Sequence, residues 1–116
     1  MNLTDFRYEL FFELSPDLLC IAGYDGYFKK INAAVSNTLG YSTEELYARP
    51  INDFVHPDDR ELTHKVRTEL TKAKPLFHFE NRYQTKNGET LWLSWTSLPV
   101  ESDKLIFAIA KARAHE

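Results

Sequence analysis

Hydrophobic positions at the start of the chain recur with the spacing of an amphipathic helix. Leu3, Phe6, Leu10 and Leu14 share one face of residues 2–14, as a period of 3.6 residues requires. Aromatic side chains lie on its other faces too, so this helix carries more apolar surface than one core contact needs. Two interpretations stay open: the helix lies between core and solvent, or its second face meets another chain. The candidate dimer residues are Phe6, Tyr8, Leu10, Phe11 and Phe12.

Short apolar runs separated by turn residues then predict an antiparallel hairpin. Ser15-Pro16-Asp17 ends the helix, because proline blocks its continuation and disfavours a helical residue before it. Residues 18–24 and 27–31 are the predicted strands. Asp25-Gly26 between them is a strong two-residue hairpin signal.

Capping residues divide the middle of the chain into short helices. Asn32 is the predicted N-cap of a helix over residues 33–39, and Gly40 is its stop. Ser42 and Glu45 have the spacing of a capping box, in which each side chain bonds the other residue's backbone. This segment is therefore predicted to fold as several short helices.

A longer helix is predicted over about residues 58–73. Asp58 and Glu61 repeat the capping-box spacing at its start. Apolar residues at helical spacing form its predicted buried stripe. They are Leu62, Val66, Leu70 and Ala73.

Alternating and continuous apolar runs predict three strands at the end of the chain, over residues 76–85, 89–100 and 105–110. Lys86-Asn87-Gly88 and Ser102-Asp103 are the turns between them. Continuous apolar strands indicate a sheet covered on both faces. We expect the middle helices on one face and the N-terminal helix on the other. The fold class is therefore α+β.

Composition excludes several classes of protein. The 116 residues fit a single domain, 1–116, without linkers or repeats. A net charge of −3 and a pI near 5.8 do not fit a nucleic-acid-binding surface. No apolar run approaches the length of a membrane span, and the N-terminus lacks a signal-peptide pattern, so no membrane contact is expected. The lone Cys20 suits a reducing cytoplasm.

The order of these elements and turn residues resembles the PAS family of sensory domains. The resemblance implies a five-stranded antiparallel sheet of order 2-1-5-4-3 over residues 18–110, with helices on one face. It also implies a homodimer formed through the N-terminal helix and an effector domain in cis, such as a histidine kinase, beyond the tail at 111–116. The matching segments are Ser15-Pro16-Asp17, Asp25-Gly26, Asn32, Leu39-Gly40-Tyr41-Ser42, Glu44-Glu45-Leu46, His56-Pro57-Asp58-Asp59, Lys86-Asn87-Gly88-Glu89, Trp92 and Pro99.

One departure from the family pattern concerns the end of the last strand. Many PAS domains end there in Asp-Ile-Thr, which couples the sheet to an output helix. The acidic residue is absent at the matching position, Ala112. This leaves the route of output coupling open.

Cofactor chemistry of the family finds little support in these residues. Flavin-adduct domains carry a cysteine in an Asn-Cys-Arg-Phe-Leu-Gln stretch on a middle helix, whereas Cys20 lies in the first strand, so we exclude that chemistry. A haem ligand would come from the long helix, but His64 should face solvent if Leu62 is central to the buried stripe. No histidine pair has zinc-ligand spacing, so no metal site is predicted.

Catalysis is not predicted either. The acidic pairs Glu44-Glu45 and Asp58-Asp59 lie at helix starts, where they satisfy backbone donors. The sequence has neither a phosphate-binding glycine loop nor a serine nucleophile elbow. We therefore expect a domain that is not an enzyme.

A cavity between the sheet and the middle helices is the remaining candidate site. Strand alternation together with the family resemblance assigns its lining, and Trp95 and Tyr83 are expected to leave it small or filled. Three functions stay open: a sensory module that relays state through dimer geometry, a small-molecule receptor, and a protein-docking module. The predicted lining residues are Cys20, Ala22, Asn81, Tyr83, Leu93, Trp95, Ser97 and Ala108.

Overall fold

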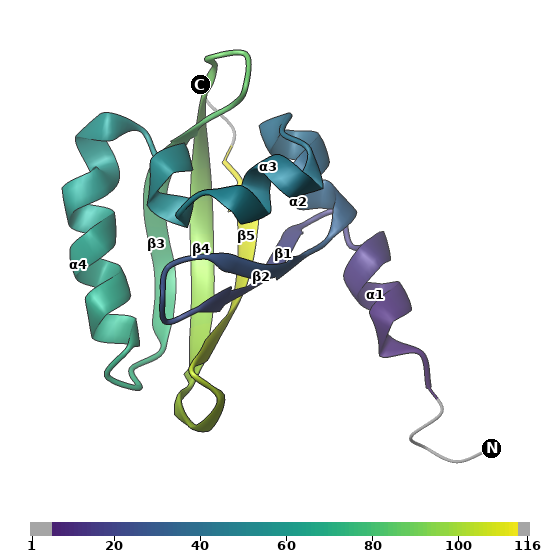
Figure 1. Cartoon of the computed structure of the whole chain (residues 1–116), viewed down its shortest axis with the longest axis vertical. Helices are drawn as coiled ribbons and strands as arrows, with labels where there is room; N and C mark the ends of the chain where they lie inside the picture. The colour runs from purple at the N-terminus through teal and green to yellow at the C-terminus, as the bar shows by residue number, and fades with distance from the viewer. Residues whose placement is uncertain (1–5, 114–116) are drawn as a thin grey trace.

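The architecture is a five-stranded antiparallel sheet with helices on one face. A computed structural model describes residues 6–113. The strand order is β2-β1-β5-β4-β3 (Figure 1), which confirms the sequence prediction. The strands are β1 (Leu18–Gly23), β2 (Phe28–Ile31), β3 (Leu76–Gln84), β4 (Thr90–Val100) and β5 (Leu105–Ala112).

Four α-helices and three short 3-10 turns complete the described residues. The helices are α1 (Tyr8–Leu14), α2 (Ala33–Leu39), α3 (Thr43–Ala48) and α4 (Arg60–Leu70), and the 3-10 turns are Ile51–Phe54, Pro57–Asp59 and Glu101–Asp103. Two predicted caps are confirmed. The Asn32 side chain accepts from the backbone N–H of Val35, and Ser42 and Glu45 form the capping box. The helix boundaries between residues 32 and 48 therefore follow from local residues.

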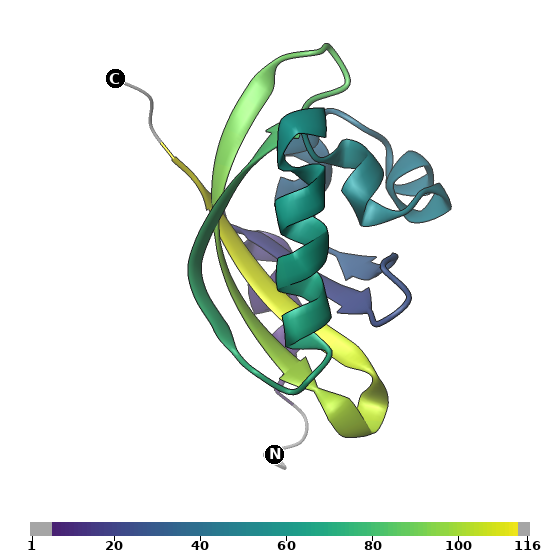
Figure 2. The ribbon, with the colours of Figure 1, turned by 90° about the vertical axis from the view of Figure 1, so that its left-hand side faces the viewer.

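Helices α2, α3 and α4 lie on the same side of the curved sheet (Figure 2). The core fills the space between these helices and the sheet. Leu39, Leu46 and Phe54 are fully buried on the helix side. Leu93 and Ala110 are fully buried on the sheet side. The candidate site is in this layer.

Helix α1 does not cover the other face of the sheet, and that expectation was wrong. It lies beside α2 and projects away from the sheet (Figure 1), and none of its residues is buried. The cause is the turn after the helix. The Asn32 amide bonds the carbonyl oxygens of Phe12 and Asp17, which fixes the helix end beside the start of β1. Residues 2–5 of the predicted helix lie outside the described residues.

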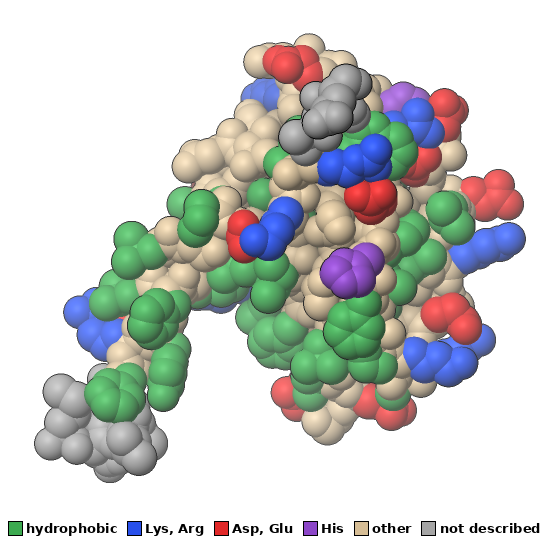
Figure 3. Space-filling view, turned by 180° about the vertical axis from the view of Figure 1, so that it is seen from behind, with side chains coloured by type: hydrophobic (Ala, Val, Ile, Leu, Met, Phe, Trp, Pro, Cys, Tyr) green, Lys and Arg blue, Asp and Glu red, His purple; other side chains and the backbone are tan. Residues whose placement is uncertain are grey.

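The outer face of the sheet is exposed as a result. Leu98, Phe107 and Ile109 are each more than two-fifths exposed. Leu98 pairs with Phe107 across β4 and β5, and Ile109 is next on the same face. Figure 3 shows this face with apolar side chains on it and α1 projecting from its edge.

The predicted buried stripe of α4 is confirmed at Leu70 and at the half-buried Val66, but it was wrong at Leu62 and Ala73. Leu62 is 53% exposed, whereas its neighbour Thr63 is 5% exposed. Ala73 lies beyond the helix end, with a positive φ of 64°. One residue turns a helix by about 100°, so the face toward the sheet contains Thr63, Arg67 and Leu70.

A contact between α4 and β3 explains this rotation. The Asp59 carboxylate pairs with the Arg82 guanidinium at 2.6 Å and accepts from the Arg82 backbone N–H at 2.7 Å. Asp59 is thus the residue that joins the helix start to the sheet. The predicted capping box of Asp58 and Glu61 does not form, because the N-cap is Asp59 and its side chain makes no cap bond.

Candidate functional site

A cavity of about 50 Å³ lies between α4 and the inner face of the sheet. Six of the eight residues proposed from the sequence line it: Cys20, Asn81, Tyr83, Trp95, Ser97 and Ala108. Ala22 and Leu93 do not line it, because both are buried in the packed part of the core. The structure adds lining residues from the helix layer, among them Phe28, Ile51, Thr63, Arg67 and Leu70.

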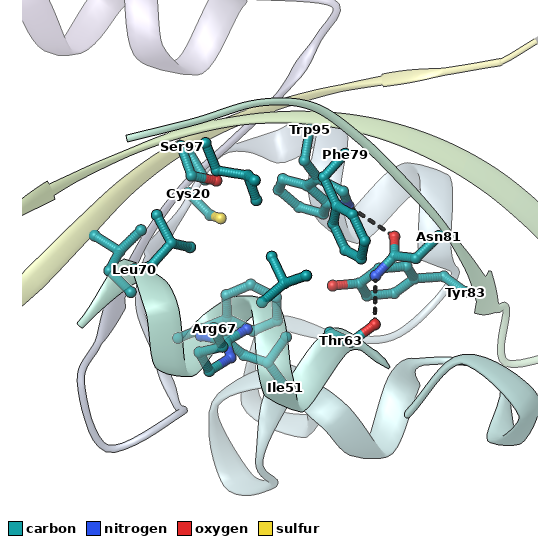
Figure 4. A pocket seen from close by; sticks show the side chains of 15 residues that line it. Cys20, Ile51, Thr63, Arg67, Leu70, Phe79, Asn81, Tyr83, Trp95 and Ser97 are labelled. Carbon is teal, nitrogen blue, oxygen red and sulfur yellow. Dashed lines mark hydrogen bonds between the residues drawn. The ribbon is translucent and has the colours of Figure 1, made fainter. Parts of the chain in front are cut away.

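A buried hydrogen-bonded triad forms one wall of the cavity (Figure 4). The Trp95 indole N–H donates to the Asn81 side-chain oxygen at 3.0 Å, and the Asn81 amide donates to the Thr63 hydroxyl at 3.0 Å. Asn81 therefore satisfies polar groups on both neighbours and fixes the indole in place. The Trp95 ring takes up space on the sheet side, and this explains why the cavity is small.

Two hydroxyl groups face the cavity without a partner among residues 6–113. Tyr83 is 2% exposed, and Figure 4 shows its hydroxyl pointing into the hollow. The Ser97 hydroxyl lies across from it on the β4 side. Burial raises the pKa of Tyr83, so the phenol stays protonated and can donate a hydrogen bond. These hydroxyls can therefore orient a polar atom placed in the cavity.

Cys20 lines the cavity as a neutral thiol. Burial raises its pKa to about 12, although the charge of Arg67 opposes this shift. Only a thiolate is a strong nucleophile. Cys20 therefore acts as a small apolar group of the wall.

Sequence reasoning missed Arg67, which is the only charged residue among those lining the cavity. It lies four residues after Thr63 and three before Leu70, so the three share one face of α4. That spacing was visible in the sequence. The predicted stripe shared Leu70 with this face but began at the apolar Leu62 instead of Thr63, and therefore it did not include Arg67.

The histidines of residues 6–113 do not line the cavity. His64 is exposed on α4, and the His56 ring accepts from the backbone N–H of Asp58 in the turn before that helix. Among residues 6–113 there is no group of three or more His, Cys, Asp or Glu side chains that could hold a metal ion.

Between residues 6 and 113, no helix combines the length and the apolar character that crossing a membrane requires.

The chain belongs to the PAS fold family, whose sequence profile matches residues 28–110. Solved structures of other proteins have a similar fold. A PAS domain of an HTR-like protein from Haloarcula marismortui is 28% identical, with a TM-score of 0.78 over 95% of this chain and 97% of that one. A domain of a sensory box sensor histidine kinase/response regulator from Geobacter sulfurreducens is 23% identical, with a TM-score of 0.80 over 90% of each chain.

A curated relative is much longer than this chain. It is the aryl hydrocarbon receptor nuclear translocator homolog of Drosophila melanogaster, which is 34% identical over 70 residues. The match covers 60% of this chain and 11% of that protein. The chain thus matches about a tenth of the length of this relative.

Proposed function

We propose that this chain is a non-catalytic sensory module of a larger signalling protein and that it relays its state through the geometry of a homodimer. The observation that carries this proposal is helix α1. Phe11 and Leu14 are 75% and 78% exposed, and Tyr8 is 65% exposed. Such a helix has lower free energy when its apolar side chains are covered. A second copy of the chain is the proposed cover.

The outer face of the sheet supplies a matching apolar surface. Leu98, Phe107 and Ile109 adjoin one another there. Exposed apolar patches rimmed by polar residues are typical of protein interaction sites. We infer that α1 of one copy packs against this face or against α1 of its partner. A change in the core would then alter the geometry of the dimer.

Coupling between the core and α1 is supported by Asn32. Its side chain bonds the carbonyl oxygen of Phe12 in α1 and also accepts from the backbone N–H of Leu19 in β1. A movement of the sheet would therefore change the angle at which α1 leaves the domain. An effector domain in cis would read this change, and the Geobacter protein of similar fold is a sensor histidine kinase/response regulator.

The acidic residues support a role without catalysis. Glu45 completes a capping box and pairs with Lys86, and Asp59 pairs with Arg82. These carboxylates have structural partners and lie outside the cavity lining. The free, buried Cys20 fits our proposal that the module works in the cytoplasm.

Sedimentation equilibrium of residues 1–116 at several concentrations tests the dimer. We expect a dimer for the wild-type chain and a monomer for Phe11→Glu, because the charge would have to be buried in the interface. Leu62→Glu on α4 is the matched control, since Leu62 is also an exposed apolar residue but lies far along the chain from α1. A strict monomer at the highest concentration would contradict the proposal and favour the docking module.

A second candidate function is a small-molecule receptor. The observation that favours it is the cavity with its two unpartnered hydroxyls at Tyr83 and Ser97. Native mass spectrometry of freshly purified protein tests this function. A retained small molecule, or a thermal shift with one member of a metabolite panel, is the expected result.

A further inference from the structure

Arg67 differs from the other arginines of the described chain. Its side chain is half-buried at the cavity, and its guanidinium has neither an ion-pair partner nor a hydrogen-bond acceptor among residues 6–113. Taking a cation out of water without a counter-ion is unfavourable. The other five have partners: Arg7, Arg49, Arg82 and Arg113 pair with carboxylates, and Arg60 donates to two backbone carbonyls.

Within the cavity lining, the groups beside Arg67 add hydrogen-bond donors but no negative charge, and Glu69 of the neighbouring hollow pairs with Lys72 and Lys74. Carboxylates are absent from the residues that line the cavity. The Tyr83 hydroxyl points into the hollow with no partner in the described chain (Figure 4). Burial raises the pKa of Tyr83 and the Arg67 charge opposes this, so the positive potential of Arg67 reaches the phenol. A cation beside an unpartnered donor is the arrangement that binds an anionic oxygen.

Most of the remaining lining residues are apolar, although Thr63, Asn81 and Ser97 are polar, and this restricts the kind of anion. Phe28, Ile51 and Ile106 belong to this apolar part of the lining. An inorganic anion would leave these side chains facing a charge, whereas an alkyl group would cover them. The anion therefore needs one charged end and one apolar end.

The volume of the cavity restricts the size of the anion. A cavity of about 50 Å³ is roughly three to five times the space that one buried water needs. A second hollow, of about 230 Å³, shares Val66, Leu70 and Leu76 with the lining of the cavity and lies beside the C-terminal end of α4.

We propose that the cavity binds a short-chain monocarboxylate of about two to four carbons. Its carboxylate accepts hydrogen bonds from the Arg67 guanidinium and the Tyr83 hydroxyl. Its alkyl chain lies against Ile51 and Ile106. This inference rests on the receptor function proposed above and names the ligand class for it.

Sodium propionate is the probe for this inference. It is titrated into ¹⁵N-labelled protein at constant ionic strength, with sodium chloride as the salt control and 1-propanol as the neutral analogue. The Trp95 indole N–H and the Ser97 amide report on the cavity. We expect propionate to move both signals to saturation at millimolar concentrations. Propanol should bind at least about ten-fold more weakly, because it lacks the charge.

Variants locate the binding groups. Arg67→Gln should weaken propionate binding by about ten-fold or more, and Tyr83→Phe by about three- to ten-fold. Lys65→Gln is the matched control: it removes one positive charge from an exposed position on the same helix. It should leave binding unchanged. Circular dichroism confirms that each variant is folded.

Three results would overturn the inference: no saturable shift with propionate, equal binding of propanol, or equal binding by Arg67→Gln. A neutral molecule retained in native mass spectrometry without propionate binding would remove the carboxylate class and leave the receptor function standing. Failure of dimerisation in the same samples concerns only the relay proposal.

Discussion

The side-chain amide of Asn32 donates a 2.9 Å hydrogen bond to the backbone carbonyl oxygen of Phe12. The same amide donates to the carbonyl oxygen of Asp17 at 2.9 Å, and its oxygen accepts from the backbone N–H groups of Leu19 and Val35. One side chain, 1% exposed, therefore joins α1, β1 and α2.

Replacing Asn32 with alanine should loosen α1 from the core. The Phe12 and Asp17 carbonyls would each lose a bond, so we expect a loss of about 2–4 kcal/mol in the free energy of unfolding. Hydrogen exchange should also rise in α1. Urea denaturation and hydrogen-exchange mass spectrometry measure the two effects. Ser42→Ala is the control, because it removes a helix cap far from α1 at a cost of about 1 kcal/mol. Unchanged exchange in α1 of the Asn32 variant would argue against this coupling.

Trp95→Phe should enlarge the cavity and destabilise the domain. The Asn81 side-chain oxygen would lose its indole donor, and part of the wall would be empty. We expect a loss of about 1–3 kcal/mol, measured as a lower denaturation midpoint. Phe77→Leu is the control at an exposed aromatic position. Phe77 is 66% exposed, so its cost should stay within about 0.5 kcal/mol.

The Asp59–Arg82 ion pair predicts a pH dependence of stability. The hydrogen bond from Arg82 lowers the pKa of Asp59 below its ordinary value of 3.8. A carboxyl whose pKa is lower in the folded state stabilises the fold above the unfolded pKa, and this contribution is lost as the pH falls through the folded pKa. Asp59→Asn should therefore cost about 1 kcal/mol near neutral pH.

The cost of Asp59→Asn should shrink as the pH falls through the lowered pKa of the folded state, because the wild-type carboxyl then also becomes protonated. Urea midpoints at neutral pH and at an acid pH below that pKa measure this. Asp58→Asn is the control, because the Asp58 side chain is 72% exposed and lacks a partner like Arg82. A cost that is equal at both pH values would show that the Asp59 charge does not matter.

Cys20 should resist thiol reagents in the folded protein. Burial raises its pKa to about 12, so the thiolate is scarce at about pH 8 and the sulfur is covered. We expect labelling by Ellman's reagent about a thousand-fold slower than that of a free cysteine. Labelling should become complete in guanidinium chloride. Leu62→Cys supplies an exposed comparison, and fast labelling of the wild-type thiol would contradict the assignment of Cys20 to the buried wall.

Local signals explain why most of the fold could be predicted from the sequence. Asp25-Gly26 makes a tight turn with Gly26 at a φ of 87°, and Ser42 with Glu45 begins α3. Such signals depend on residues within about four positions of one another. Strand alternation together with the family resemblance then placed Cys20 and Trp95 on the inner face of the sheet.

Long-range contacts account for what the sequence did not predict. The face of α4 depends on Asp59 pairing with a residue 23 positions later, and the direction of α1 depends on Asn32, 20 positions beyond Phe12. Periodicity favoured Leu62 because it counts apolar residues and does not count a threonine that bonds Asn81. For the same reason, periodicity did not predict that Arg67 lines the cavity.

Leu18 at the start of β1 lies directly opposite Ala110 near the end of β5. Asp17 and Lys111 form an ion pair at 3.4 Å beside them. Paired residues of antiparallel strands have Cα atoms only about 5 Å apart. The core of the domain could therefore be inserted as a cassette into a longer polypeptide while the two segments it interrupts stay neighbours. Tandem duplication or transfer to another host protein would need no long connection.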